Sequence, residues 1–280
     1  MKKILLTLLV TFLVFPSVPT VGAENEPSSL SLLAINVRKA DALLLRSGNS
    51  AYLIDTGSEE SSPALLAALR SEGVSRLSGV ILTHTHKDHV GGLEALLASG
   101  ITIDQVYASG YYNKKKESKH PAVKALKGTG REVAFLFAGD TLPLDGGILT
   151  VIGPLEQDTE DENNNSLVLL AEGGGGKILL AGDMEFPEEN SLLKAGAVPA
   201  ADVLKVGNHG EDDATSYELV TTVSPSLAVI STNSDDEPDT PSPRVLQVLS
   251  ACGVNTVFTE GTQLGVEITV RNGEISTENK

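Results

Sequence analysis

The segment at residues 83–92 constrains this chain more than any other. It packs three of the five histidines and one aspartate into six consecutive positions. The apolar run 80–82 before it predicts a buried strand, and the residues 93–97 after it predict the opening of a helix. The cluster is therefore expected in a strand-to-helix loop at the carboxyl end of a strand, where open α/β sheets commonly place their chemistry.

The spacing within this loop indicates metal binding. In extended backbone, His84 and His86 point to the same side, because side-chain direction repeats every second residue. Asp88 and His89 come one turn later and can face a neighbouring point. Neutral imidazole and carboxylate are common ligands of zinc and similar ions, and burying them together without a metal would cost desolvation free energy. Two pairs of ligands predict a site for two metals.

Three further polar residues follow apolar runs that predict strands. Asp183 follows the run 178–181 after one glycine, and His209 lies three residues after the run 203–206. Both residues therefore stand at strand ends, as the first cluster does. Asp55 directly follows an apolar run as well. Two interpretations are open for it: a carboxylate that holds a ligand histidine in place, or a turn or helix-capping residue.

The segment 111–120 is the only basic stretch of the chain that is flanked by aromatic residues. One interpretation is a mobile flap over an anionic substrate, with Tyr112 stacking and the lysines holding phosphate. The other, which we favour, is a solvated lysine face that leads into a helix at 122–126. His120 stands too far from any companion motif to count as a ligand.

The beginning of the chain has the pattern of a secretory signal peptide at residues 1–23. A basic start precedes an apolar run, and a small-residue pattern then predicts cleavage after Ala23. Residues 24–29 are expected to form a short leader before a domain at 30–280. No other stretch approaches the roughly 20 apolar residues that a membrane span needs. We therefore expect a secreted or periplasmic protein without a membrane span after cleavage, with a retained anchor as the alternative.

The charge of the chain argues against extensive nucleic-acid binding. The 280 residues carry 21 Lys and Arg against 37 Asp and Glu, a formal charge of −16. Removal of Lys2 and Lys3 leaves 19 basic against 37 acidic residues, a charge near −18. An acidic surface repels nucleic acid, whose binding proteins usually carry a basic face. Nucleic acid is therefore a possible partner that the acidic charge disfavours.

Elsewhere the apolar periodicity predicts one strand-rich α/β domain with two similar halves and no linker. Strands are expected at 30–37, 42–45, 51–54, 80–82, 101–107, 133–137, 148–152, 166–171, 177–181, 203–206, 227–231, 256–258 and 265–270, and helices at 63–69, 122–126 and 242–251. The glycines at 173–176 predict a tight hairpin, because no helix follows and the phosphate-loop signature is absent. The single cysteine, Cys252, leaves no internal disulfide and is expected to be a core thiol.

These residues resemble a known family. The pattern His-x-His-x-Asp-His followed by Gly-Gly at 84–92 is similar to the signature loop of the metallo-β-lactamase superfamily. The order of the later motifs resembles the ComEC-type branch, a hydrolase domain appended to a DNA-uptake channel, and its free-standing secreted relatives. Those motifs are at residues 55–57, 164–169, 180–183 and 204–210. The resemblance covers nearly all of the chain from about residue 30.

The resemblance implies an αββα four-layer sandwich with its site at one edge between the two sheets. It implies two divalent metals bridged by Asp183, with zinc as the expected metal and manganese as the alternative. The remaining ligands would be His84 and His86 for the first metal, and Asp88, His89 and His209 for the second. The nucleophile would be a metal-bridging hydroxide, and Asp88 would orient it or receive a proton.

The chain departs from the family pattern at three places. The lactamase and lactonase branches have a third histidine where this chain has asparagines at 163–165, which argues against β-lactam hydrolysis. Water or substrate would then complete the first metal. ComEC-like sequences commonly have histidine at the positions of Asn208 and Thr240. The candidate substrate contacts are Asn165, Asn208 and Tyr112.

Together with the resemblance, these residues imply a secreted, metal-dependent phosphodiesterase, with nuclease-like activity as its family-level form. A small-molecule or surface-attached phosphodiester would suit the acidic charge better than nucleic acid. Two alternatives are open. One is a non-catalytic binding protein stabilised by metal, which the departures at Asn208 and Thr240 suggest. The other is a hydrolase of carboxylic esters, lactones or thioesters at the same metal centre.

Overall fold

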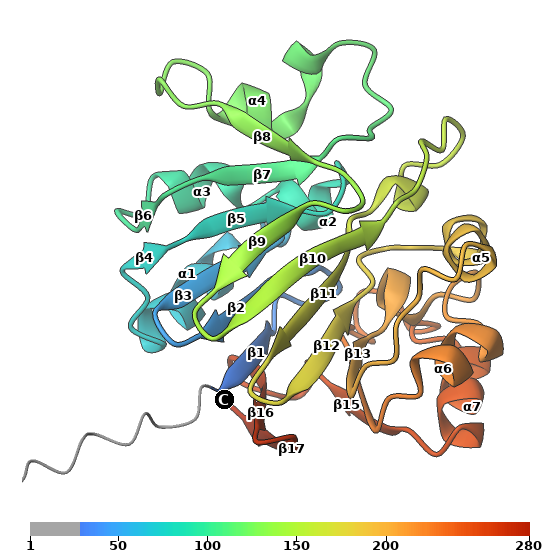
Figure 1. The fold of residues 1–280 in the computed structure, drawn as a ribbon. Coiled ribbons are helices and arrows are strands. Elements are labelled where there is room, and N and C mark those ends of the chain that lie inside the picture. The colour runs from blue at the N-terminus through green and yellow to red at the C-terminus, as the bar shows by residue number, and fades with distance from the viewer. Residues whose placement is uncertain (1–28) are drawn as a thin grey trace, which may run out of the picture.

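Two mixed β-sheets pack face to face in the computed structural model, and helices cover both outer faces (Figure 1). The structure describes residues 29–280; the expected signal peptide at 1–23 and all but the last residue of the leader lie outside the described residues. The resulting order of layers is helix, sheet, sheet, helix. This arrangement confirms the expected αββα sandwich.

The first sheet has eight strands in the order β17-β16-β1-β2-β3-β5-β7-β8. They are β1 (Leu30–Ile35), β2 (Leu43–Ser47), β3 (Ser50–Ile54), β5 (Gly79–Leu82), β7 (Val106–Ser109), β8 (Val133–Leu136), β16 (Gly265–Arg271) and β17 (Glu274–Asn279). The helices on its outer side are α1 (Ser62–Ser71), α2 (Lys87–Val90), α3 (Leu93–Leu97) and α4 (Pro121–Ala125). A separate small sheet pairs β4 (Arg76–Leu77) with β6 (Thr102–Ile103).

The second sheet has seven strands in the order β15-β14-β13-β12-β11-β10-β9. They are β9 (Thr141–Leu144), β10 (Gly147–Gly153), β11 (Val168–Gly173), β12 (Gly176–Leu180), β13 (Val203–Lys205), β14 (Leu227–Ile230) and β15 (Asn255–Phe258). The helices on its outer side are α5 (Phe186–Lys194), α6 (Tyr217–Val223) and α7 (Pro243–Ala251). Among the described residues, none of the helices combines the length and apolar character needed to cross a membrane.

Strand β1 shows why the chain folds into four layers. Leu32 packs in the core between the two sheets, whereas Leu33 and Ile35 pack under the helices of the first sheet. Successive side chains of a strand point to opposite faces, so a sheet covered on both sides requires a nearly continuous apolar run. The partly buried Cys252 packs beside the apolar cluster under α5–α7, at the edge of the core rather than deep within it.

Most predicted strands are confirmed to within a few residues, but residues 101–107 were expected to form one strand and form two. Asp104 interrupts the run, because its carboxylate pairs with Arg76 at the surface. Strand β6 therefore joins the small sheet and β7 joins the large one. The glycine hairpin is confirmed, since β11 and β12 pair antiparallel around Gly174 and Gly175, which both have positive φ.

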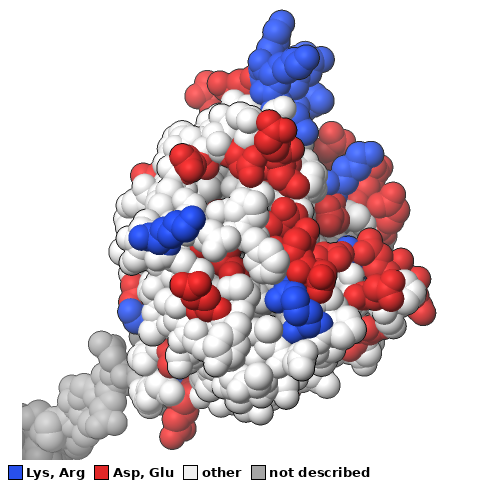
Figure 2. Space-filling model, turned by 90° about the vertical axis from the view of Figure 1, so that its right-hand side faces the viewer, with Lys and Arg blue, Asp and Glu red and all other residues white. Residues whose placement is uncertain are grey.

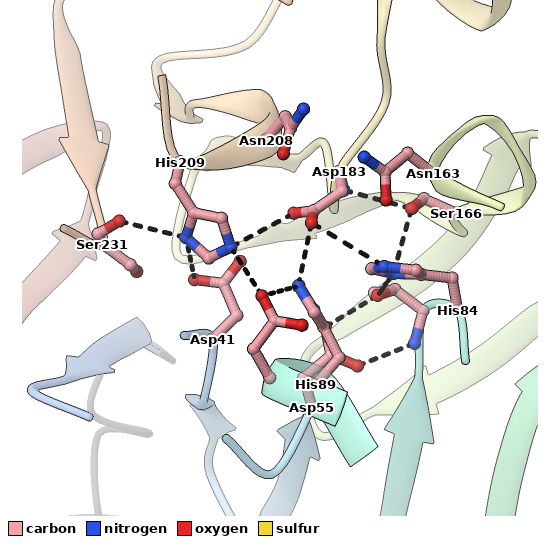
Figure 3. A network of polar contacts seen from close by, with 12 residues as sticks. Asp41, Asp55, His84, His89, Asn163, Ser166, Asp183, Asn208, His209 and Ser231 are labelled. Atoms are coloured by element: carbon pink, nitrogen blue, oxygen red, sulfur yellow. Dashed lines mark hydrogen bonds and ion pairs between the residues drawn. The ribbon is translucent and has the colours of Figure 1, made fainter. Parts of the chain in front are cut away.

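The strand directions place the polar residues at one edge of the sandwich. In the first sheet, β3 and β5 are parallel, so Asp55 and the histidine loop follow at the same end. In the second sheet, β12, β13 and β14 are parallel, so Asp183 and His209 also follow neighbouring strand ends. The two sets of strand ends meet between the sheets (Figures 1 and 3).

Candidate metal centre

Two histidines from different sheets are held by their Nδ1 atoms and turn their Nε2 atoms toward the same space (Figure 3). The Nδ1–H of His89 donates to Asp55 Oδ2 at 2.7 Å. The Nδ1–H of His209 donates to the backbone carbonyl of Ser231 at 3.1 Å. An Nδ1–H donor fixes the lone pair on Nε2, which is the usual arrangement of a metal-binding histidine. The structure therefore favours the interpretation of Asp55 as the carboxylate that holds a histidine.

His84 is held in a similar way by two hydroxyl groups. Its Nδ1 lies 3.1 Å from Thr83 Oγ1 and 3.2 Å from Ser166 Oγ. Ser166 also accepts a hydrogen bond from the backbone N–H of Asp183 at 3.1 Å, so this hydroxyl links the two sheets at the site. The first histidine and the aspartate are thereby fixed relative to one another.

Asp183 lies among the three imidazoles. Its Oδ2 is 3.0 Å from His89 Nε2 and 3.7 Å from His84 Nε2. Its Oδ1 is 3.6 Å from His209 Nε2. Asp88 Oδ2 lies 3.6 Å from His89 Nε2 and 3.5 Å from His209 Nε2. The structure thus brings together five of the six residues that the sequence predicts as metal ligands.

Several buried atoms of this cluster fit a bound cation. Within residues 29–280, His84 Nε2, His209 Nε2 and Asp183 Oδ1 have no hydrogen-bond partner. An unpaired buried polar atom costs about 1–3 kcal/mol, so three together need an explanation. A divalent cation would be a common partner for them, and a set of imidazole nitrogens and carboxylate oxygens suits zinc or manganese.

The sixth predicted ligand, His86, stands at the surface. Its ring meets the edge of the His84 ring at 4.7 Å between centroids, and its side chain is exposed. The two histidines are therefore neighbours, as the alternation in the loop predicts, but only His84 is buried. His86 is the member of the cluster that solvent and substrate can reach.

The charge states of one histidine and two aspartates in the cluster suit metal binding. Burial and the nearby His89 lower the pKa of His84 well below its usual value, so this imidazole is neutral. Burial would raise the pKa of Asp183, but His89 and His209 outweigh it and hold that pKa well below the ordinary value. At Asp88, burial would also raise the pKa, but His209 and His89 outweigh burial and lower it. Both carboxylates are therefore ionised at neutral pH.

Two of the imidazoles lie among carboxylates. At His209, burial would lower the pKa, but Asp183 and Asp41 outweigh burial and raise that pKa above the usual value. His89 lies between two carboxylates as well. Burial disfavours its protonated form, but Asp183 and Asp55 outweigh burial and raise its pKa well above the usual value. A cation that binds Nε2 of His89 has to displace a proton from that nitrogen.

The Asp-Thr-Gly turn after β3 fixes the helix that carries His89. The N–H and Oγ1–H of Thr56 both donate to the backbone carbonyl of His89, at 2.6 and 2.9 Å. The N–H of Gly92 donates to the carbonyl of Gly57 at 3.1 Å. A Cβ at Gly92 would lie 2.2 Å from the carbonyl oxygen of Thr56, so this close approach requires glycine. The Gly-Gly pair thus allows the histidine loop to pack on the turn.

Sequence reasoning missed two buried residues beside the cluster. One ligand atom each from Asp41, His89, Asp183 and His209 lie within 4.8 Å of one another. Lys205 Nζ lies 2.9 Å from Asp41 Oδ2, and both side chains are fully buried. Burial would raise the pKa of Asp41, but Lys205 and the histidines outweigh it and lower that pKa. The sequence holds one sign of this pair: Lys205 lies within the apolar strand β13, and a buried lysine usually requires an acidic partner.

An asparagine stands in the segment 163–165, where the family resemblance would place a third histidine. Asn163 begins a short 3₁₀ helix, η2 (Asn163–Asn165), and its Nδ2 donates to Glu185 Oε1 at 2.7 Å. Its Oδ1 is buried and has no hydrogen-bond partner among the described residues. In Figure 3 its amide lies beside Ser166 and Asp183. The position therefore offers a neutral oxygen in place of an imidazole.

Two of the three expected substrate contacts are used inside the protein. Asn165 is fully buried, and its amide bonds the backbone of the loop before it, accepting from Asp158 N at 2.9 Å and donating to Asp158 O at 2.8 Å. The expectation for Asn165 is therefore wrong, because no polar atom of its side chain is left for a substrate. The ring of Tyr112 stacks on Phe135 at 5.6 Å and packs against His120, so it is not a free stacking surface.

Asn208 lies at the site, as the sequence predicts, in a strained turn. Asn208 and His209 both have positive φ, at 43° and 52°, within the short 3₁₀ segment η3 (Gly207–Gly210). The Nδ2 of Asn208 donates to Glu185 Oε1 at 3.2 Å and to Asp213 Oδ1 at 3.3 Å. Asparagine tolerates this left-handed backbone better than most residues. The contact of Asn208 with substrate stays a prediction.

Comparison with curated proteins supports the resemblance. ComE operon protein 3 of Bacillus subtilis (strain 168) is 28% identical over 196 residues, which are 70% of this chain and 25% of that protein. Competence protein ComA of Neisseria gonorrhoeae is 27% identical over 225 residues, which are 78% of this chain and 29% of that protein. The chain spans roughly a quarter of the length of these relatives. Similarity to these competence proteins confirms the expected likeness to the ComEC-type branch.

A solved structure shows the fold of this chain, and a sequence model shows its family. The metallo-beta-lactamase fold protein YhfI from Bacillus subtilis superposes with a TM-score of 0.57 at 12% identity, covering 90% of this chain and all of that one. That likeness shows the fold. Residues 35–232 match the sequence model of the metallo-beta-lactamase superfamily. The chain belongs to the metallo-β-lactamase superfamily.

Proposed function

We propose that the chain is a secreted, metal-dependent phosphodiesterase. The observation that carries the proposal is the convergence of three histidine Nε2 atoms on Asp183, with Asp88 beside them. These residues, together with the exposed His86, would hold two divalent cations. Bound metal would supply Lewis-acid activation of water and would neutralise charge on the phosphoryl oxygens. The fold supports hydrolysis, and the signal-peptide pattern at residues 1–23 supports export.

Asp88 is the residue of the cluster best placed to orient an attacking water. Its side chain is 37% exposed, whereas Asp183 is 3% exposed, so Asp88 lies at the mouth of the site. Its lowered pKa keeps it ionised, and an ionised carboxylate accepts a hydrogen bond from water. The same low pKa makes Asp88 a weak proton acceptor, so its proposed role is orientation rather than general-base catalysis.

The first test is the metal content of the mature protein, measured by elemental mass spectrometry after purification without chelators. We expect about two metals per chain, because the spacing of the histidine loop and the family resemblance both predict ligands for two metals. We also expect turnover of bis(p-nitrophenyl) phosphate that is lost on chelation and restored by zinc or manganese. One or two bound metals without turnover would support the non-catalytic binding protein instead. Protein that stays free of metal after zinc and manganese are supplied would refute both proposals.

A second prediction concerns the carboxylate that holds His89. We expect Asp55→Asn to weaken metal binding about 10- to 100-fold, because removal of a carboxylate partner of a ligand histidine typically costs this much. The measurement is competition for zinc with a coloured chelator of known affinity. Asp104→Asn is the matched control, because Asp104 forms an ion pair with Arg76 at the surface. Equal zinc affinity in Asp55→Asn and Asp104→Asn would show that Asp55 does not support the centre.

A further inference from the structure

A cleft of about 930 Å³ opens directly beside the candidate metal centre. Its walls come from α2, α3, α4 and the segment 111–120, and Thr85 and His86 of the histidine loop form part of its lining. The exposed ring of His86 lies 4.7 Å from the ring of buried His84. The cleft therefore reaches the histidine cluster, and we call it the lysine cleft after the residues that dominate its charge.

The lysine cleft is basic on an acidic protein. Lys87, Lys114, Lys119 and Lys124 line it together with two glutamates, so the lining carries a formal charge of +2 while the whole chain carries −16. All four lysines are exposed. Figure 2 shows basic side chains gathered at the top of the molecule, where Figure 1 places the segment around α4, and many acidic side chains on the face below.

These four lysines are not used in the fold. Within residues 29–280, none of them lies within 4.0 Å of a carboxylate, whereas Lys39 and Lys177 both form ion pairs. Four ammonium groups that repel one another without neutralising partners raise the local positive potential. An anion in the lysine cleft would relieve that repulsion, and phosphate is a common partner of lysine.

The segment that carries Lys114 is tied to the histidine loop. Buried Glu162 accepts hydrogen bonds from Thr85 Oγ1 and from the backbone N–H of Asn113, the latter at 2.7 Å. On its other side the segment is ordered by Tyr112, which packs on Phe135. These contacts hold the backbone next to Lys114 in a defined position beside the histidine loop.

Part of the lining of the lysine cleft is apolar. Val90 of α2, Leu93 of α3, and Pro121 and Ala125 of α4 contribute to it. A ligand that fits both surfaces combines an apolar group with a negative charge. The acidic face below would repel a long polyanion such as duplex DNA, so the charge pattern favours a short ligand.

We propose that the lysine cleft binds the arm of a small phosphodiester substrate that carries a second phosphate beside an apolar group. This inference rests on the proposed phosphodiesterase function and adds the substrate class. The scissile phosphodiester lies at the metal centre, His86 lies between the two sites, and Lys114, Lys119 and Lys124 hold the distal phosphate. Each exposed contact contributes little, so several together are needed for a preference of about tenfold.

The test compares two chromogenic substrates that differ by one phosphate: the p-nitrophenyl ester of thymidine 5′-phosphate, and the same compound with a 3′-phosphate. At low salt we expect a KM about tenfold lower for the 3′-phosphorylated compound. The triple variant Lys114→Ala, Lys119→Ala and Lys124→Ala should remove this preference, and the matched triple Lys→Arg variant should keep it. Lys194→Ala, on α5 and outside the lysine cleft, is the single-residue control.

A binding measurement separates failure of the lysine cleft from failure of the proposed function. Thymidine 3′,5′-bisphosphate is titrated into the metal-loaded protein by calorimetry, which requires no turnover. We expect binding about tenfold weaker in the triple alanine variant and unchanged in Lys194→Ala. If neither nitrophenyl substrate is hydrolysed but the triple alanine variant binds the bisphosphate more weakly, the lysine cleft is supported as a phosphate-binding site and the phosphodiesterase proposal fails. If the wild type and the triple alanine variant have the same KM ratio for the two nitrophenyl substrates and the same affinity for the bisphosphate, the proposal that the lysine cleft binds the second phosphate is overturned.

Discussion

Replacement of Asp183 by asparagine is expected to lower kcat/KM for bis(p-nitrophenyl) phosphate by at least about 1000-fold and to reduce the bound metal to one ion or none. Within residues 29–280, Asp183 is the one carboxylate that lies within 3.7 Å of the Nε2 atoms of His84, His89 and His209. Asparagine keeps its shape but removes the negative charge that two cations would share. Loss of metal-derived stabilisation costs several kcal/mol in the transition state, and each 1.36 kcal/mol is a factor of ten.

The measurement combines initial rates with elemental mass spectrometry on the same preparation. Asp104→Asn serves as the control, because it makes the same chemical change at an exposed ion pair far from the histidine loop in the first sheet. Asp183→Asn should also remove the rise in thermal stability that zinc gives the wild type, since a ligand stabilises only the state that binds it. An Asp183→Asn protein with two metals and wild-type turnover would exclude the proposed role of Asp183.

The part of the site that could be predicted from sequence is the part built by local spacing. His84, His86, Asp88 and His89 lie within six residues, so their proximity depends only on one loop and one helical turn. The apolar runs before Asp183 and His209 identify these residues as strand ends, and parallel strands place their ends together. The family resemblance then supplied the order of the layers.

The part that could not be predicted depends on packing between the two sheets. Asp41 stands between two alanines in the loop after β1, and nothing local distinguishes it from a turn residue. It reaches the centre because Lys205, 164 positions away, lies beneath it in the other sheet. The prediction that Asn165 contacts substrate is wrong for a related reason. Only the fold shows that the side-chain amide of Asn165 is hydrogen-bonded to the backbone of Asp158.

The prediction for Lys205 follows from this packing. In Lys205→Met the buried carboxylate of Asp41 loses its ammonium partner, and removal of one partner from a buried ion pair typically costs about 3–5 kcal/mol. For a domain of this size that corresponds to a fall in melting temperature of about 10 °C. The measurement is thermal and denaturant unfolding in the presence of chelator, so that metal binding does not compensate for the loss.

A double variant decides whether the unpaired charge is the cause. In Asp41→Asn with Lys205→Met no buried charge is left, so we expect most of the lost stability to return, and a double variant as unstable as Lys205→Met would contradict this account. Zinc should stabilise Lys205→Met more than it stabilises the wild type. Asp41 Oδ1 lies 4.0 Å from His209 Nδ1 and has no hydrogen-bond partner among the described residues. Once the ammonium group of Lys205 is gone, a cation bound beside Asp41 would neutralise this buried carboxylate in its place, so binding of zinc would contribute more to stability.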